Sequence, residues 1–340
     1  MKTKLGIDIG SHSIKLVELG RDGQSDVLVS IGSIATPPKA LSSTLQADQQ
    51  AVSEAIKQLV KQANVKTRDV IIALPESLVF TRVIEVPQLS ERELSSAIHW
   101  EAEQYVPLPL DQVNLDFTIL RDSRDTQTSK MEVLLVASPK SLIDKYLKIL
   151  DQADLNPVAA ETEIISASRA LVRTVMNVKT TLVVSLGAQT TDLAILRNGT
   201  LAFTRSISAG GESLSRALVQ GLDFNPNQAE QFKQTYGLDK SQLEGKILTA
   251  VKPIMDTIIS EMKRAIGYYQ EKYPQEKVEV ILITGGTAKL PGMVMYIAEE
   301  IGIEVQLGSP FIGIRRDERF VQFDQEGPTY CVAIGLALRP

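Results

Sequence analysis

The chain has 340 residues, which is enough for two domains with substantial hydrophobic cores. Its 36 Lys and Arg residues and 41 Asp and Glu residues give a formal net charge of −5, which argues against a broad nucleic-acid-binding face. Cys331 is the single cysteine, so an internal disulfide framework is excluded, and with His12 and His99 as the only histidines the composition argues strongly against a His/Cys zinc site.

The two ends of the chain carry no expected membrane signal. MKTK leads directly into the strand-like LGIDIG, so we expect no signal peptide. No apolar run approaches the length that crosses a bilayer, and the C-terminal VAIGLALRP shows no amphipathic anchoring helix. We therefore expect a cytoplasmic protein without direct membrane insertion, which reaches a membrane only through another protein.

Three strand-like runs open the chain: KLGIDIG (4–10), SIKLVELG (13–20) and DVLVSIGSI (26–34). They are followed by an amphipathic helix with apolar residues at helical spacing: Val52, Ile56, Leu59, Val60 and Ala63. The run DVIIALP (69–75) then predicts a buried strand that closes this first unit.

Residues 76–157 differ in character and predict an inserted α+β segment. Its expected elements are a strand at 78–86, a helix from Ser90, strands at 113–120 and 131–138, and a helix at 139–153. The polar stretch RDSRDTQTSK (121–130) predicts a hairpin loop. A helix reading ETEIISASRALVRTV follows from Glu161.

At Thr180 the opening pattern returns. Residues 181–207 again predict three strands joined by tight turns, with Asn198-Gly199 as a strong hairpin signal. Helices are expected near 211–220, 227–236 and 243–271, then a buried strand at 278–284 and a helix from Pro291. The third of these helices has one apolar stripe and contains Pro253, which is expected to start or kink it: Ile247, Val251, Ile254, Ile258, Met262, Ile266 and Tyr269.

Two glycine turns stand at the heads of these two similar units. DIGSHSIK (8–15) and SLGAQTTD (185–192) share an apolar residue and a glycine, then a hydroxyl residue three positions later. The repetition predicts a duplicated α/β domain with one phosphate-binding loop per half. Glycine at a hairpin tip lets backbone N–H groups approach a polyphosphate, and Lys15 can add positive charge.

A third glycine turn, ITGGTAKLPG (283–292), lies between the last buried strand and its helix. Gly285 and Gly286 have no side chains, so a flat ring can lie directly on their backbone. Pro291 suits the first turn of a helix. Alone, this pattern is equally typical of an ordinary strand–helix turn.

In this order, the three turns resemble the phosphate 1, phosphate 2 and adenosine motifs of the actin-like ATPase superfamily, over nearly the whole chain. The resemblance implies a two-domain, duplicated, ribonuclease H-like α/β fold that binds ATP or ADP with Mg²⁺. It implies a first domain at 1–175, with the insertion at about 76–157 and residues 320–340 packing back on it, and a second domain at 176–319. Helix AEQFK (229–233) matches a family helix that contacts adenine and ribose, although Glu230 and Lys233 also fit a solvated ion pair.

The resemblance implies the following nucleotide-binding residues: Gly10, Ser11, His12, Ser13, Lys15, Gly187, Ala188, Gln189, Thr190, Gly210, Gly211, Glu230, Lys233, Gly285, Gly286, Thr287 and Lys289. Asp8 and Asp192 are the candidate acids that would hold Mg²⁺ through water. Glu163, or its neighbour Glu161, matches the position that orients the attacking water in this superfamily.

Within the superfamily, four stretches resemble the PilM family of type IV pilus assembly proteins: LGIDIGSHSIKLVEL (5–19), WEAEQYVPLPLDQV (100–113), ETEIISASRAL (161–171) and PTYCVAIGLALR (328–339). This resemblance implies an ATP-binding adaptor that serves fimbrial biogenesis and twitching motility. Its implied partner is the N-terminal cytoplasmic tail of a PilN-like bitopic membrane protein, and through it PilO; the pilus assembly ATPases are a separate, indirect partner. The adaptor would thus lie at the inner membrane.

The helix from Ser90 offers a binding face for such a partner. Ser90 and Glu93 form a capping box, and the helix has one apolar stripe: Leu94, Ala97, Ile98, Ala102 and Tyr105. Trp100 falls nearly opposite that stripe, either as an interface residue or packed on a neighbouring subdomain. The expected partner-binding residues are Ile98, Trp100, Glu101, Tyr105, Val106 and Pro107.

Ser185 stands where the second phosphate turn normally carries an acid. A serine can bind a metal-bound water but brings no charge, so we expect ATP to be bound and hydrolysed slowly or not at all. Two alternatives remain from sequence: a filament-forming protein similar to FtsA, and a small-molecule kinase of the same fold. The kinase needs a base facing an acceptor, for which only Glu161 and Glu163 are candidates.

Overall fold

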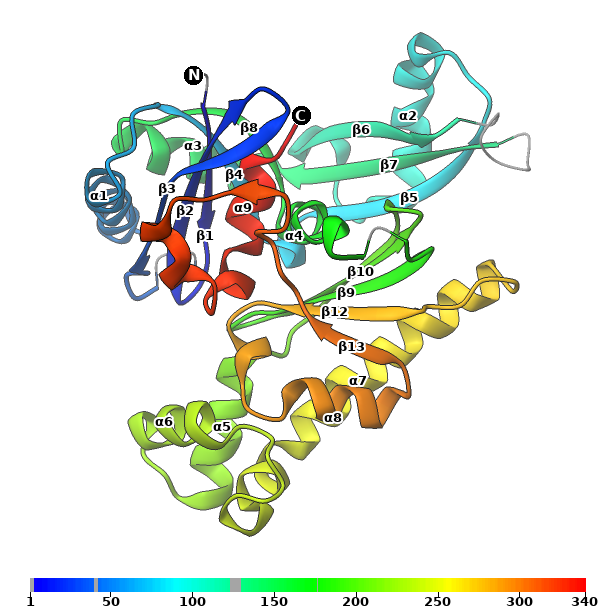
Figure 1. Cartoon of the computed structure of the whole chain (residues 1–340). Coiled ribbons are helices and arrows are strands. Elements are labelled where there is room, and N and C mark those ends of the chain that lie inside the picture. Colours follow the sequence, from blue (N-terminus) through cyan, green and yellow to red (C-terminus); the bar gives the residue numbers. More distant parts are fainter. Residues whose placement is uncertain (1–2, 40–41, 123–129, 176) are drawn as a thin grey trace.

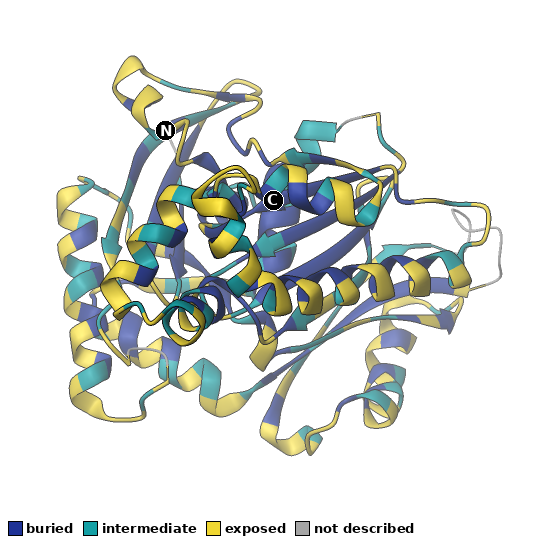
Figure 2. Ribbon diagram, turned by 90° about the horizontal axis from the view of Figure 1, so that it is seen from below, coloured by how far each residue is buried: buried dark blue, intermediate teal, exposed yellow. Residues whose placement is uncertain are grey.

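The computed structural model describes residues 3–39, 42–122, 130–175 and 177–340. Its strands form a six-stranded sheet, a five-stranded sheet and a three-stranded sheet, and helices cover these sheets (Figure 1). Buried residues concentrate on the strands and on the inward faces of the helices, while the outward faces of the helices are exposed (Figure 2). No helix in these described ranges is long and apolar enough to span a bilayer.

The first half is built on the six-stranded sheet, in the order β14-β3-β2-β1-β4-β8. Its strands are β1 (Thr3–Ile9), β2 (Ser13–Asp22), β3 (Ser25–Ala35), β4 (Asp69–Leu74), β8 (Asn156–Thr162) and β14 (Ile314–Arg315). Helices α1 (Gln46–Gln62) and α3 (Lys140–Gln152) share a core with one face of this sheet. Helices α4 (Glu163–Leu171) and α9 (Cys331–Ala337) lie on the other face (Figure 1).

The second half repeats this plan. Its sheet has the order β11-β10-β9-β12-β13, with β9 (Thr180–Leu186), β10 (Thr191–Arg197), β11 (Thr200–Ile207), β12 (Val280–Thr284) and β13 (Glu304–Leu307). Helices α5 (Gly211–Leu222), α6 (Pro226–Tyr236), α7 (Lys246–Lys272) and α8 (Met293–Ile301) pack on one face, and α4 reaches the other. In each half two antiparallel hairpins precede a parallel strand, as the repeated sequence pattern predicts.

A small subdomain carries the third sheet, in the order β5-β7-β6, with its own core under α2 (Glu91–Tyr105). Its strands are β5 (Phe80–Pro87), β6 (Val113–Arg121) and β7 (Lys130–Pro139). Tyr146, Ile149 and Leu150 of α3 pack instead with the six-stranded sheet. The small subdomain therefore ends near Pro139, earlier than the 157 expected from composition, because the apolar face of α3 matches the larger core.

Most local expectations are met, and three are corrected. Asn198 and Gly199 both have positive φ and close the β10–β11 hairpin, while Pro253 lies inside α7 rather than at its start. Glu161 lies within β8, which ends at Thr162, so the following helix begins at Glu163. Pro291 precedes Gly292, the N-cap of α8, and is thus outside the helix. The predicted hairpin loop falls largely on residues 123–129, outside the described residues, and β6 and β7 on either side of it pair antiparallel.

The chain returns to the first half after β13. β14 pairs in parallel with β3, and α9 packs on β1 and α4, so the end of the chain completes the core of the half in which the chain began (Figure 1). Short 3₁₀ segments link the elements: Glu76–Leu78, Leu110–Gln112, Val172–Val175, Leu243–Gly245, Thr287–Lys289, Glu318–Phe323 and Gly327–Tyr330.

Candidate functional site

A cavity of about 720 Å³ opens between the two halves. The tips of the β1–β2 and β9–β10 hairpins, the turn after β12, and the starts of α4 and α5 line it, together with α6. All the residues predicted to bind nucleotide line this cleft except Gly210. Gly210 stands behind the wall, where an added Cβ would lie 2.7 Å from the carbonyl oxygen of Ala188.

The tip of the first hairpin is held by Thr36, the residue that follows β3. Thr36 Oγ1 donates to the Gly10 carbonyl at 2.6 Å, and the Thr36 N–H donates to the His12 carbonyl at 3.0 Å. A Cβ at Gly10 would meet the Ser13 carbonyl at 3.0 Å, so a larger residue would disturb the turn. Lys15, opposite Asp8 in the hairpin register, places its Nζ 3.8 Å from Asp8 Oδ2. A cation thus lies beside the buried acid at the cleft.

The second hairpin ties three loops together through one carbonyl. The Gly187 oxygen accepts hydrogen bonds from the Gly211 N–H at 3.0 Å and from Thr287 Oγ1 at 2.9 Å. The Gly187 N–H in turn donates to the Thr190 carbonyl at 2.9 Å. This arrangement fixes the β9–β10 turn, the start of α5 and the turn after β12 relative to one another.

Lys233 is not part of a solvated helix face. It is only 7% exposed, and its ammonium donates to the Gly211 carbonyl at 3.1 Å, to Ser215 Oγ at 2.9 Å and to Glu230 Oε2 at 2.7 Å. Ser215 Oγ also donates to Glu230. The structure therefore places Glu230 and Lys233 together on the cleft wall, and the solvated ion pair that the sequence left open is wrong for Lys233.

Asp8, Glu163 and Asp192 approach one another at the inner end of the cleft. Burial raises the pKa of Asp8, although the nearby charge of Lys15 opposes this. Burial also raises the pKa of Asp192 to about 6, against the hydroxyls of Ser206 at 2.5 Å and Thr190 at 3.2 Å, which favour its charged form. The pKa of Glu163 lies well above its usual value, first because of desolvation by the surrounding walls and then because of the neighbouring acids.

Glu161 is separate from this group. Its carboxylate pairs with Arg169, whose Nη2 lies 2.8 Å from Glu161 Oε2, and Arg339 lies 3.8 Å away. Of the two acids considered at this position, only Glu163 lines the cleft. Glu161 is the last but one residue of β8, so its side chain has the orientation of a strand and not of a helix start.

Glu76 is a buried acid that the sequence reasoning missed. It is 6% exposed, and burial raises its pKa to about 7, with the charge of Asp192 adding to the shift. The hydroxyls of Thr162, Thr204 and Thr81 lie close enough to favour its charged form, yet its Oε2 makes no hydrogen bond of good geometry within the described residues. The sequence showed only a Pro-Glu at the end of a strand, which gives no signal of burial.

The end of the chain supplies a further wall that the sequence reasoning also missed. Phe323, Glu326, Pro328, Thr329 and Tyr330 line the cleft. The Pro328 carbonyl accepts from the Gly285 N–H at 3.0 Å and from Thr284 Oγ1 at 2.7 Å, and Glu326 forms an ion pair with Lys289. The stretch PTYCVAIGLALR carries the family resemblance, but its pattern does not indicate a position at the cleft.

The cleft fits a nucleotide better than it fits a directly bound metal. A Cβ added at Gly286 would meet nothing within 4 Å, so the backbone there is open to a flat ring. Lys15 from the first half and Lys233 from the second half both line the cleft. Within the described residues no cluster of three or more His, Cys, Asp or Glu side chains could hold a metal ion directly. Ser185 lies between Asp192 and Thr284 in the sheet register, where an acid would add a further carboxylate beside Asp192.

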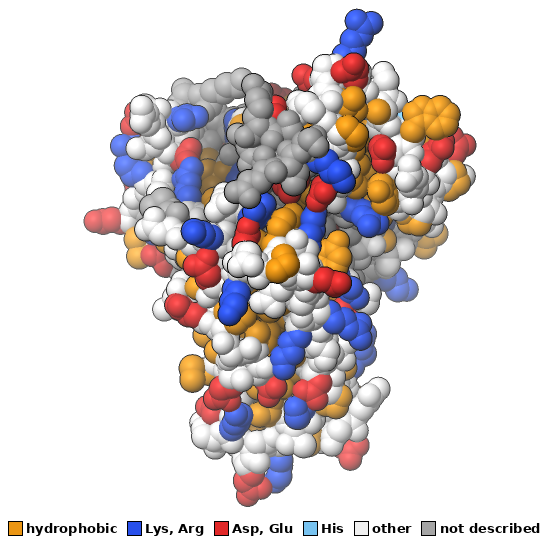
Figure 3. All heavy atoms as spheres, turned by 90° about the vertical axis from the view of Figure 1, so that its right-hand side faces the viewer, with side chains coloured by type: hydrophobic (Ala, Val, Ile, Leu, Met, Phe, Trp, Pro, Cys, Tyr) orange, Lys and Arg blue, Asp and Glu red, His pale blue; other side chains and the backbone are white. Residues whose placement is uncertain are grey.

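The predicted partner face on α2 is partly surface and partly core. Trp100 is 74% exposed, so it does not pack on a neighbouring subdomain, and the capping box of Ser90 and Glu93 is formed. Figure 3 faces the side of the molecule that carries the small subdomain, and apolar side chains are exposed on its upper part. Ile98 and Val106, by contrast, are buried in the core under α2 and present no surface to a partner.

The chain as a whole is similar to one known family and to several solved structures. The family described as type IV pilus assembly protein PilM matches residues 6–340. A solved structure titled "PilM-PilN type IV pilus biogenesis complex" superposes with a TM-score of 0.87 at 29% identity, over 99% of this chain and 98% of that one.

More distant relatives show the actin-like fold. The ethanolamine utilization protein EutJ from Carboxydothermus hydrogenoformans has a TM-score of 0.58 at 19% identity over 99% of this chain and 90% of that one. MreB5 of Spiroplasma citri, solved with ADP, has a TM-score of 0.54 at 12% identity over 99% and 96%. The cell division protein FtsA of Streptococcus pneumoniae is 26% identical over 91% of this chain and 76% of its own length.

Proposed function

Since this chain belongs to the type IV pilus assembly protein PilM family, we propose that it is a cytoplasmic, nucleotide-binding adaptor for the N-terminal tail of a PilN-like membrane protein. The observation that carries the proposal is the match to a PilM–PilN complex over nearly the whole of both chains. An exposed tryptophan on a helix of the small subdomain adds a surface suited to a peptide. The tail would hold the protein at the inner membrane and connect it indirectly to PilO and the assembly ATPases.

ATP or ADP is the proposed ligand of the cleft. The open backbone at Gly286 suits the adenine ring, Glu230 and Lys233 suit the ribose, and the tips of the two glycine hairpins suit the phosphates, with Lys15 adding charge. Mg²⁺ bound with the nucleotide would add charge neutralisation at the phosphates, with Asp8 and Asp192 contacting it through water.

Hydrolysis is proposed to be slow or absent. Ser185 brings no charge to the metal side of the cleft, and the raised pKa of Glu163 leaves less negative charge there near neutral pH than an ordinary carboxyl would. The nucleotide would then mainly fix the angle between the two halves. A steady-state ATP turnover on the order of one per second, an ordinary enzymatic rate, would contradict this.

The adaptor proposal is tested with a synthetic peptide of the candidate PilN N-terminus, chosen without tryptophan, and the full-length protein. Trp100 is the single tryptophan, so its emission reports directly on α2. We expect the emission to change on titration, with or without ATP, and Trp100→Ala to weaken binding in calorimetry by about tenfold or more, as for an interface anchor. Met295→Ala, at another exposed apolar residue, on α8, serves as the matched control. Calorimetry without any heat of binding in either nucleotide state would refute the adaptor role.

The relatives among FtsA proteins support one alternative, a filament-forming protein. It predicts that the protein sediments as polymers in ATP at micromolar concentration, whereas the adaptor predicts a discrete complex with the tail. The small-molecule kinase has less support, because Glu161 pairs with Arg169 and leaves Glu163 as the one carboxyl of that pair at the cleft.

A further inference from the structure

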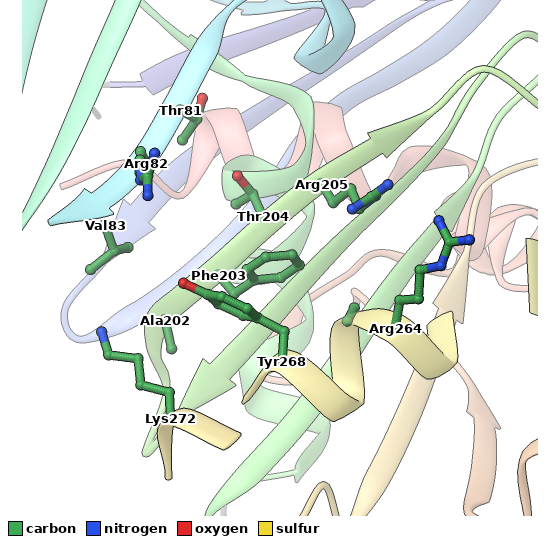
Figure 4. Close-up of a pocket in the computed structure, with 11 residues that line it drawn as sticks. Thr81, Arg82, Val83, Ala202, Phe203, Thr204, Arg205, Arg264, Tyr268 and Lys272 are labelled. Atoms are coloured by element: carbon green, nitrogen blue, oxygen red, sulfur yellow. The ribbon is translucent and has the colours of Figure 1, made fainter. Parts of the chain in front are cut away.

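A second cavity, of about 430 Å³, lies where the small subdomain meets the second half, away from the nucleotide cleft. Its walls come from β5, β11 and α7 (Figure 4). The lining residues are Thr81, Arg82, Val83, Ala202, Phe203, Thr204, Arg205, Arg264, Ala265, Tyr268 and Lys272. None of the residues proposed for ATP or for the PilN-like tail is among them.

Both strand walls present an edge to this groove. β5 is the outer strand of the three-stranded sheet and β11 is the outer strand of the five-stranded sheet. Neighbouring residues in a strand point to opposite faces, so a groove lined by the consecutive residues 81–83 and 202–205 meets each strand from its edge. In the described parts of the chain, neither β5 nor β11 forms a backbone hydrogen bond to an element other than its own sheet partner. Free strand edges are the surfaces to which an extended polypeptide adds.

The floor of the groove is aromatic. The rings of Phe203 and Tyr268 lie 5.2 Å apart at an angle of 40°, and Figure 4 shows them side by side between β11 and α7. Tyr268 is 52% exposed, and Ala202 and Ala265 beside it leave room for an apolar side chain. The Thr81 hydroxyl is buried and lies beside Glu76, so it turns away from the groove.

The charge of the groove is positive. Its lining holds four cationic side chains, Arg82, Arg205, Arg264 and Lys272, and no carboxylate of the residues that the structure describes. Arg205 and Arg264 share one acid, Glu261, at 2.6 Å each. Lys272 pairs with Glu85 at 2.8 Å, and Arg82 lies over the ring of Tyr105. Two carboxylates thus compensate the charge of the four cations only in part. Figure 3 shows Lys and Arg side chains on this side of the molecule, below the small subdomain.

We propose that this groove docks an acidic, extended polypeptide segment that pairs along the edge of β11. This strand edge would supply backbone hydrogen bonds, the aromatic floor would take one apolar side chain, and the cations on the rim would attract the acidic residues. The proposal goes beyond the adaptor role and stands independently of it.

The first test is a fluorescence anisotropy titration of the full-length protein with three labelled octapeptides. One alternates Val and Glu, one alternates Val and Lys, and one is the Val–Glu peptide with alternate amides N-methylated. We expect the acidic peptide to bind. Its affinity should fall as the salt concentration is raised, since screening reduces charge attraction. We expect the lysine peptide not to bind, and N-methylation to weaken binding by about tenfold or more, because it removes the backbone donors along one edge.

Two neighbouring residues of α7 provide a matched pair of variants. Arg264→Glu reverses a charge in the groove and is expected to lower the affinity for the acidic peptide by about tenfold at low salt. Lys263→Glu makes the same change of charge at the next, exposed residue, which does not line the groove, and is expected to have a much smaller effect. Tyr268→Ala is expected to weaken binding by removing one ring of the floor.

Four outcomes would overturn the proposal: no binding of the acidic peptide, equal binding of the acidic and basic peptides, unchanged affinity after N-methylation, or equal losses in the two α7 variants. Displacement of the acidic peptide by a short oligonucleotide that binds more tightly would also do so, because it would make the groove a nucleic-acid site. Trp100→Ala separates this site from the adaptor role, since it should weaken binding of the PilN-like tail and leave binding of the acidic peptide unchanged.

Discussion

Four carboxyl groups, Asp8, Glu76, Glu163 and Asp192, surround the inner end of the cleft, and desolvation is the main reason that the pKa of each is raised. Three of them face the space proposed for the phosphates, whereas Glu76 lies behind, next to Thr81 and Thr204 of the second groove. A neutral acid in the apo protein can therefore become charged when a metal ion or cation approaches, because an opposite charge favours its ionised form.

Glu76 is expected to make stability fall as pH rises. The unfolded chain loses this proton near its ordinary pKa of 4.5, while the folded protein keeps it until about 7. The free energy of unfolding should therefore decrease between about pH 4.5 and 7, by on the order of 3 kcal/mol at about 1.4 kcal/mol per unit. Glu76→Gln keeps a neutral side chain at every pH. In urea unfolding, the free energy of unfolding of this variant should therefore increase relative to that of the wild type as pH rises from about 5 to 8. Glu103→Gln, at an exposed residue of α2, controls for the chemical change. A difference that does not vary with pH would contradict this.

Ser185→Asp is expected to tighten Mg²⁺-dependent nucleotide binding by about tenfold, because it adds charge beside Asp192 where a metal's water shell would lie. The same like-charge pair should lower the stability of the apo protein. Calorimetry of ATP binding with Mg²⁺ and with EDTA measures the effect, and Ser185→Asn controls for side-chain size. Unchanged affinity in the aspartate variant would count against the proposed metal position.

At the scale of elements, the backbone of α9 lies in direct contact with the backbones of α4 and β1. A Cβ added at Gly335 would lie 1.8 Å from the Ser166 carbonyl oxygen of α4, and one at Gly6 of β1 would lie 2.3 Å from the Ala333 carbonyl. Ser166 Oγ also donates to the Val332 carbonyl at 2.7 Å. Because backbone cannot yield as a flexible side chain can, these glycines set how closely α9 approaches both neighbours.

Gly335→Ala should therefore destabilise the protein by about 3 kcal/mol or more, as overpacked and strained cores do. Gly267→Ala is the matched control, since Gly267 lies inside α7 with nothing within 4 Å of an added Cβ. That change should stabilise by about 0.5–1 kcal/mol through helix propensity. Denaturant unfolding of both variants gives the comparison, and a loss below about 1 kcal/mol at Gly335 would show that α4 and α9 can separate at little cost.

At the scale of the whole molecule, the cleft draws its walls from both halves and from the returning C-terminal segment. A ligand that contacts all three should resist their separation. Saturating ATP, at about 100 times its Kd, should stabilise the folded state by about 2.7 kcal/mol and raise the apparent Tm by several degrees. Lys233→Met should reduce this shift, while Lys240→Met, at an exposed residue paired with Glu299, should not. A wild-type Tm that does not respond to ATP would contradict a nucleotide role for the cleft.

The elements and the turns were largely predictable from sequence, because they depend on neighbours within a few residues. The capping box of Ser90 and Glu93, the positive φ of Asn198 and Gly199 and the apolar stripe of α7 follow from local chemistry. The duplicated glycine turns also identified the cleft, since similar units place similar turns at the same end of their sheets. Trp100 was expected on the polar face of its helix by periodicity alone, and it is exposed.

What only the tertiary structure decided depends on residues far apart in the chain. The burial of Glu76 needs β8, β10 and β11 around it, and the wall formed by Pro328 and its neighbours needs a chain that crosses back to its first sheet. The charged groove needs the edges of two sheets brought together by the packing of separate subdomains. Periodicity and turn chemistry specify each element by itself, but which edges and side chains meet is set by long-range packing, and that packing leaves no local pattern in the sequence.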